Sequence, residues 1–352
     1  MKTNNTMLSL FCLVKRNIKL YMKNKMTVFF SVLAPVIVLL LYILFLGDLQ
    51  VNNILGILQD EGVTEIAGKD IRSLIDSWMI SGVMAVSCIT VTVNASTTMV
   101  RDRAQGNVND VLSSPVKRWV LYLSYIISCF IITFSICFIV FVISSCYLAG
   151  VGAFHMSFLD VICVLAIMIL SILSSSFFTT LFCSFIKTQS TLAAVNGVFS
   201  TAIGFLIGAY LPFSMLPKVI QYIACFIPGA YSAGLFRNYF LRGTVNYLIG
   251  IAPDKVDVIN KIISQYSVEL EFFGHEVSAG VAVLVIAASI LLFGAIIWIL
   301  YANKKTNFFN NGRKVKKQKF SVKKVKVTAV QVQITEENSV VQEVVNDKED
   351  TK

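Results

Sequence analysis

Long apolar stretches alternate with short polar connections over most of the chain. Six of these stretches contain no Asp, Glu, Lys or Arg: residues 28–46, 78–99, 119–148, 161–185, 191–211 and 277–301. At 1.5 Å per residue the shortest would form a helix of about 29 Å, which matches a hydrocarbon core of about 30 Å. Because lipid offers no hydrogen bonds to the backbone, such stretches must be helical. The pattern predicts an all-α polytopic membrane protein with six transmembrane helices.

The composition excludes a water-soluble enzyme. Of the 352 residues, 56% are hydrophobic and only 14% are charged, whereas soluble domains carry about 25% charged residues. The net charge of +10 would suit nucleic acid. The basic residues adjoin the apolar stretches, however, so we expect membrane lipid as their partner and no nucleic acid.

The positions of Lys and Arg predict the orientation of the chain. These residues are sparse in three connections, 47–77, 149–160 and 212–276, and are concentrated in the other polar segments. Under the positive-inside rule the basic segments are cytoplasmic. We therefore predict a multi-pass protein of the plasma membrane (or of the inner membrane, in a cell with two), with both termini in the cytoplasm.

The N-terminal segment has two kinds of helical face. Between residues 6 and 25, apolar side chains recur on one face, and Lys15, Lys19 and Lys23 recur on another. This pattern predicts an amphipathic helix that lies on the inner leaflet.

Two long connections are predicted to be external loops. Residues 47–77 are mainly acidic, and residues 212–276 are divided by several prolines. Within the second connection, the apolar stretch Val219–Ile227 is too short to span, which predicts a re-entrant hairpin before the last helix.

The C-terminal segment is polar and has little that could form a core. Basic residues dominate from Lys304 to Lys326, and acidic residues dominate from Glu336 onward. We predict a disordered cytoplasmic tail whose basic part attracts anionic lipids. The predicted organisation is an interfacial helix at 1–27, a six-helix membrane domain at 28–301 and a tail at 302–352.

No catalytic, cofactor-binding or metal-ligating residues are predicted. The sequence has no G-x-x-x-x-G-K-S/T loop for a nucleotide, no H-E-x-x-H and no G-x-S-x-G, so we expect a protein without its own ATPase site. The eight cysteines include no C-x-x-C pair and are expected to be packing residues. Ion-coupled carriers place ionisable residues within spans. None occurs here, which favours an energy source in another protein.

Two helical faces could line a path through the membrane. The polar stripe of the second span recurs at intervals of three and four residues: Ser87, Thr90, Asn94 and Thr97. The small side chains of the fifth span include Gly197, Ser200, Gly204 and Gly208. From the residues alone, hydrogen bonds between helices explain the stripe as well as a path lining does. For the small residues, close helix packing is the default explanation.

The connection between the second and third spans is a candidate contact for a cytoplasmic partner. It is compact, it is charged, and Pro115 interrupts its helical potential. On these residues alone, a positive loop that only sets the topology is the simpler explanation.

Three segments, taken in order, resemble the ABC-2 type permease family of ATP-binding-cassette exporters. The first is the amphipathic start and a proline-containing span, Phe29–Gly47. The second is the loop Arg101–Arg118, with its pattern of charges, Gly, then Leu-x-x-Ser-Pro-x-x-Arg. The third is the hairpin Pro212–Asn238, with prolines before an arginine. The order of the six spans extends the resemblance over about residues 7–302, although Asp102 stands where family members often have Glu.

The resemblance implies a permease that pairs with a second permease chain, as a homodimer or heterodimer, and binds two separate ATPase subunits that hold the ATP. In the family, the loop after the second span and the amphipathic helix contact those subunits. The implied coupling residues are Arg101, Asp102, Arg103, Gly106, Asp110, Leu112, Pro115 and Arg118. The second and fifth spans border the central path in the family, which favours a path-lining role for the stripe and the small residues.

These observations favour the membrane subunit of an exporter for multidrug efflux or a similar amphipathic cargo, such as a peptide or a lipid-like molecule. An apolar path without fixed charges suits such cargo better than ions or charged polymers. The alternatives are a non-transporting membrane scaffold or sensor and, within the family, an exporter of polysaccharide or ions.

Overall fold

The computed structural model describes residues 2–61, 63, 66–212, 216–266, 270–272 and 275–302. The predicted C-terminal tail therefore lies outside the described residues, apart from its first position. The elements, in chain order, are α1 (Lys2–Lys23), α2 (Lys25–Leu41), the π-helical turn η1 (Tyr42–Leu46), α3 (Gly47–Asp60), α4 (Gly68–Ala95), α5 (Thr97–Gln105), α6 (Asn107–Ser113), α7 (Arg118–Val151), α8 (Phe158–Phe185), α9 (Gln189–Leu206), α10 (Lys218–Cys225), α11 (Pro228–Ile251), η3 (Pro253–Lys255), α12 (Val256–Gln265), β1 (Leu270–Phe272), β2 (His275–Val277) and α13 (Ala279–Ala302).

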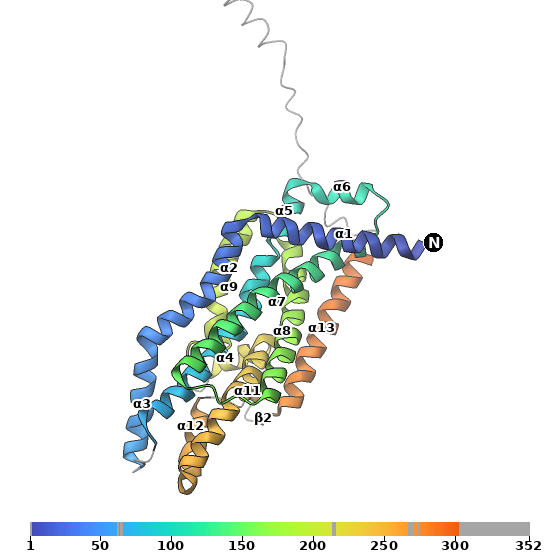
Figure 1. The fold of residues 1–352 in the computed structure, drawn as a ribbon. Helices are drawn as coiled ribbons and strands as arrows, with labels where there is room; N and C mark the ends of the chain where they lie inside the picture. The colour runs from blue at the N-terminus through green and yellow to red at the C-terminus, as the bar shows by residue number, and fades with distance from the viewer. Residues whose placement is uncertain are drawn as a thin grey trace, which may run out of the picture. The chain divides into compact units, whose positions relative to one another are not determined.

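The chain is a polytopic α-helical membrane protein. Five helical segments are long and apolar enough to cross a membrane: Lys25–Phe45, Gly68–Gln105, Arg118–Val151, Phe158–Phe185 and Ala279–Leu300. They correspond to five of the six predicted spans and run side by side in the bundle (Figure 1). The only described strands, β1 and β2, form a short antiparallel hairpin before α13.

The fifth predicted span, 191–211, corresponds to α9, which is not among these five segments. Its 18 residues would reach about 27 Å, slightly less than a hydrocarbon core. A turn follows in which Gly208 has a φ of 68°, a conformation that suits glycine. A bent pair, α10 and α11, meets at 97° and could form a sixth crossing. The count of six spans stays a prediction.

The segment predicted as the second long loop is more ordered than a loop. Much of it is α11, a 24-residue helix that packs along α4, α8 and α13. The short helices α10 and α12 lie on either side of α11 in the sequence. The stretch that predicted a re-entrant hairpin coincides with α10 and its sharp turn into α11.

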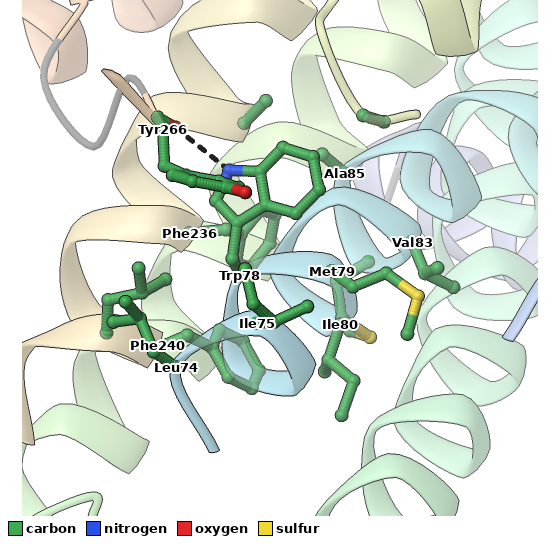
Figure 2. Packing of buried hydrophobic residues seen from close by; sticks show 14 of the residues in the cluster. Leu74, Ile75, Trp78, Met79, Ile80, Val83, Ala85, Phe236, Phe240 and Tyr266 are labelled. Atoms are coloured by element: carbon green, nitrogen blue, oxygen red, sulfur yellow. Dashed lines mark hydrogen bonds between the residues drawn. The ribbon is translucent and has the colours of Figure 1, made fainter. Parts of the chain in front are cut away.

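The helix α4 forms the centre of the molecule. It contacts α2, α3, α7, α8, α9 and α11, and every residue from Ser73 to Ile89 is buried. Figure 2 shows Leu74, Ile75 and Trp78 of α4 against Phe236 and Phe240 of α11. Because α4 is enclosed on all sides in this stretch, its apolar residues do not form a single stripe.

A buried arginine joins α4, α9 and α11. The guanidinium of Arg237 on α11 is fully buried, donates hydrogen bonds to the carbonyls of Ile207 and Gly208, and lies 5.5 Å from the centre of the Trp78 ring. The indole of Trp78 in turn donates a hydrogen bond of 2.9 Å to the carbonyl of Tyr266 (Figure 2). A buried cation needs such partners, and the carbonyls at the end of α9 provide them.

The N-terminal helix α1 lies across the end of the bundle where α7 begins (Figure 1). Its face with Leu13, Val14 and Asn17 is buried and packs on α7. Met7 and Phe11, which belong to the predicted apolar face, are exposed. The helix thus packs against protein on one side and presents apolar and basic side chains on the others.

Two glycines of α11 allow a direct test of this packing. A Cβ at Gly243 would overlap the carbonyl oxygen of His155 in the α7–α8 connection, whereas a Cβ at Gly250 meets nothing within 4 Å. We expect Gly243→Ala to lower the free energy of unfolding by about 1–3 kcal/mol. Gly250→Ala, on the same helix, should be neutral or stabilising by up to about 1 kcal/mol. Thermal unfolding of both variants in detergent measures the difference, and equal melting temperatures would contradict this packing.

Candidate functional site

The candidate site begins where α4 leads into two short helices. The helices α5 and α6 are joined at Gly106, whose φ of 84° is in the left-handed region that favours glycine. The helix α6 ends at Ser113, two residues before Pro115. We call α5, Gly106 and α6 (residues 97–113) the elbow; it lies at the same end of the bundle as α1 (Figure 1).

The carboxylate of Asp102 holds the elbow to the rest of the protein. It is only 2% exposed and accepts two hydrogen bonds from the guanidinium of Arg16, at 2.7 and 2.9 Å. It accepts a third from the hydroxyl of Tyr125, at 2.7 Å, and a fourth from the amide of Asn107, at 3.1 Å. Together these bonds join α1, α5, α6 and α7.

Arg16 and Asp102 also form an ion pair. The hydrogen bond to Asp102 raises the pKa of Arg16 above its usual range. The side chain of Arg16 is 32% exposed and that of Asp102 only 3%. Since a buried carboxylate without a partner is costly, this two-pronged pairing restrains α1 and α5 relative to each other.

A second arginine, Arg103, forms hydrogen bonds between the elbow and the end of α8. The guanidinium of Arg103 donates to the carbonyls of Cys183, Ser184 and Ile186, at 3.1, 2.5 and 3.0 Å. These carbonyls belong to the last turn of α8 and the residue after it, where a cation is favoured by the helix dipole. The adjacent residues Asp102 and Arg103 thus bind the elbow to different helices, α1 and α7 through Asp102 and α8 through Arg103.

The predicted coupling residues differ in exposure and fall into three groups. Asp102 is buried and Arg103 is half-buried, and both make internal contacts. Four others are exposed on or just after the elbow: Arg101, Asp110, Pro115 and Arg118. Gly106 and Leu112 are half-buried. The elbow therefore offers an accessible surface while its internal charges hold it in place.

Most of the polar stripe, which runs from α4 into the start of α5, is accessible. Between residues 73 and 100 every residue is buried except Thr90, Asn94, Thr97 and Thr98. The stripe then meets a small cavity of about 130 Å³ between α1 and α5. Ser87, which the spacing places on the same stripe, is buried, and its hydroxyl donates to the carbonyl of Val83 at 2.6 Å.

A side-chain amide pair brings the stripe of α4 to the small-residue face of α9. The amide of Asn196 donates to the side-chain oxygen of Asn94 at 2.6 Å, and the hydroxyl of Ser200 donates to the side-chain oxygen of Asn196 at 3.2 Å. Gly197 is exposed beside this pair, whereas Gly204 is buried against the ring of Tyr210. Gly208 lies in the turn after α9.

An apolar cavity lies farther along α9. Its volume is about 260 Å³, and its walls come from α4, α8, α9, α13 and the start of α11. Phe178, Phe199 and Ile203 line it together with the hydroxyl-bearing Ser174. The lining suits an apolar molecule with a few hydrogen-bonding groups. Among the described residues, no group of three or more His, Cys, Asp or Glu side chains could hold a metal ion.

A comparison with protein families identifies this arrangement. The family described as ABC-2 type transporter matches residues 9–241. The chain belongs to this family. The match begins in α1 and ends in α11, so it includes the elbow, the polar stripe of α4 and all of α9. None of the individually curated proteins matches the chain.

Several residues that make these contacts in the ABC-2 type transporter chain were not singled out by the sequence patterns. Arg16 was one of several cations in a basic helix, and Tyr125 was one aromatic residue within an apolar span. Asn196 was a polar residue in the small-residue helix. Only the polar character of these residues could have pointed to the contacts. Each partner lies at least 23 residues away in the sequence, so local spacing does not reveal the pairing.

A double-mutant cycle tests whether the Arg16–Asp102 pair holds α1 to the elbow. For Arg16→Gln and Asp102→Asn we expect a coupling energy of about 1–3 kcal/mol, because the carboxylate is buried. In the control pair, the side chain of Arg72 is 34% exposed and that of Asp48 is 68% exposed. This pair should couple by about 0–1 kcal/mol. Thermal unfolding of the seven proteins (the wild type, four single and two double mutants) in one detergent gives both values. A weaker coupling at Arg16–Asp102 than at the control would refute the restraint.

Proposed function

We propose that this chain is the membrane subunit of an ATP-driven exporter, in which two permease chains form the path and separate ATPase subunits supply the energy. Each ATPase subunit would bind at the exposed surface of the elbow. The observation that carries the proposal is the position of the elbow, which is accessible on one side and fastened by buried charges on the other.

The bonding of the elbow supports a coupling role. A force on its exposed surface would reach α1 and α7 through Asp102 and would reach α8 through Arg103, because these contacts are short and largely buried. The elbow also continues directly from α4. Movement of an ATPase subunit would therefore change the position of the central helix as well as its neighbours, and so link two separate sites.

The distribution of charge supports the orientation. The elbow and α1 carry the basic residues that the positive-inside rule places in the cytoplasm, where ATP is available. In this orientation α3 and α12 are external. An ion pair of 2.7 Å joins Lys261 of α12 to Glu61, the residue after α3, and its hydrogen bond lowers the pKa of Glu61.

The accessible polar face of α4 supports a path between two chains. The side-chain amide of Asn94 would be unfavourable against lipid tails, and among the described residues no other helix fully buries Thr90, Asn94 or Thr97. A second permease chain, facing this one across α4 and α9, would enclose them. Along α4 and α9 the path would have hydroxyl and amide groups but no fixed charge in its walls, with Arg16 and Arg101 only at the cavity at its elbow end, which suits an amphipathic drug, peptide or lipid-like cargo.

Purification of the tagged chain in mild detergent tests the proposal. We expect a P-loop ATPase in stoichiometric amount by mass spectrometry, with ATP hydrolysis that vanadate inhibits. Asp110→Lys should reduce the co-purified ATPase at least about tenfold, equivalent to about 1.4 kcal/mol, because it reverses the charge on the exposed side of α6. Asp257→Lys makes the same change on the exposed surface of α12 and should have no effect.

Two results would contradict the proposal. A chain that purifies alone and leaves ATP untouched, in several detergents and in nanodiscs, would indicate a scaffold or sensor. Retention of the ATPase and normal hydrolysis in Asp110→Lys would show that the elbow is not the contact.

A further inference from the structure

A groove separate from the path opens at the elbow end of the bundle. Its volume is about 650 Å³, and it lies between the residues before and within the start of α7, the middle of α8 and the last turns of α13. It falls within the size range of small-molecule sites. Two of the implied coupling residues, Leu112 of α6 and Arg118, line it, but none of the contacts that hold the elbow and none of the path residues on α4 and α9 does.

The mouth of the groove is cationic and has no acidic side chain. Lys117 and Arg118 are exposed there, and no ion pair among the described residues involves either of them. They stand at the first turn of the 34-residue α7, the positive end of the helix dipole. Two cations are unfavourable at that position unless an anion is close to them.

Two tryptophans mark the membrane surface at the groove. Trp119 is 38% exposed and Trp298 is 62% exposed, and both line the groove, one near the start of α7 and the other near the end of α13. Indole rings favour the boundary between headgroups and acyl chains. The cationic mouth therefore lies at headgroup level.

The deeper part of the groove is mainly apolar, with the buried Tyr122 among its lining residues. It extends along α7 to Ile126, about 12 Å from Arg118 at 1.5 Å per residue, and its inner wall includes Phe177 and Ile297. Gly294 of α13 adds no side chain to the wall. Cations at the surface and an apolar channel below them match one molecule with an anionic head and an aliphatic chain.

We propose that this groove binds an anionic phospholipid of the inner leaflet, with its phosphate at Lys117 and Arg118 and an acyl chain along Ile126 and Phe177. The charge at the mouth selects the anionic lipid, since each surface cation contributes about 1 kcal/mol to such binding. The proposal does not depend on the exporter function, because binding needs no ATPase.

Tryptophan fluorescence provides the test, because two of the three tryptophans line the groove and Trp78 is 1% exposed. The full chain is reconstituted in phosphatidylcholine vesicles that contain rising fractions of acyl-brominated phosphatidylglycerol or of acyl-brominated phosphatidylcholine. Bromine quenches indole emission at contact. We expect half-maximal quenching at an about tenfold lower fraction of the anionic lipid.

Charge variants distinguish the groove from other basic surfaces. Lys117→Gln/Arg118→Gln should reduce the preference to about twofold or less. The control, Lys25→Gln/Lys187→Gln, removes two exposed cations outside the groove and should keep the preference. Millimolar inorganic phosphate should not change the quenching, because the acyl chain contributes to binding.

Three outcomes would overturn the proposal. Equal quenching by the two brominated lipids would mean that the groove does not select charge. A preference that survives Lys117→Gln/Arg118→Gln would place the attraction elsewhere, for instance in the basic segment after α13. Loss of the preference in inorganic phosphate would indicate a site for free anions.

Discussion

The buried carboxylate of Asp102 is the constraint on which the elbow end of the molecule depends. A carboxylate that is 2% exposed is tolerated only if its hydrogen-bonding capacity is used, and here Arg16, Tyr125 and Asn107 all donate to it. Separation of α1 from the elbow would leave this charge unpaired, and separation of α7 would remove its hydrogen bond from Tyr125. The helices that meet at Asp102 must therefore stay together whenever the elbow moves.

A second buried charge stabilises the middle of the bundle in a comparable way. Arg237 holds the end of α9 through the carbonyls of Ile207 and Gly208 and packs on Trp78 of α4. Gly82 permits the close approach of the same turn, since an added Cβ would lie 2.9 Å from the carbonyl oxygen of Ala209. The helices α4, α9 and α11 are thus joined on the side away from the elbow. The accessible polar face of α4 lies between the contacts of Asp102 and those of Arg237. A movement of α4 would therefore change access to this face.

The sequence patterns were most informative where one physical requirement dominates. Long apolar runs without charge predicted α2, α4, α7, α8 and α13, because a span must satisfy its backbone internally. They did not predict α11 as a core helix, since Arg237 and Arg242 lower its hydropathy and the partners of Arg237 lie about 30 residues away. Helical spacing placed Ser87 with Thr90 and Asn94 on one stripe. Only the packing around α4 shows that Ser87 is enclosed while the other two are accessible.

The central claim is that ATPase movement at the elbow changes access to the polar face of α4. The most direct measurement is the labelling of Thr90→Cys by a membrane-impermeant maleimide, from each side of the membrane, in a background that lacks Cys12, Cys146, Cys163 and Cys225, the exposed and half-buried native cysteines. The account predicts that Thr90→Cys is labelled from the elbow side without nucleotide and from the opposite side with ATP and vanadate. The control is Ile139→Cys, on the apolar surface of α7, where Ile139 is 46% exposed. It should stay unlabelled in both states. Labelling of Thr90→Cys that is the same in both states would contradict the account.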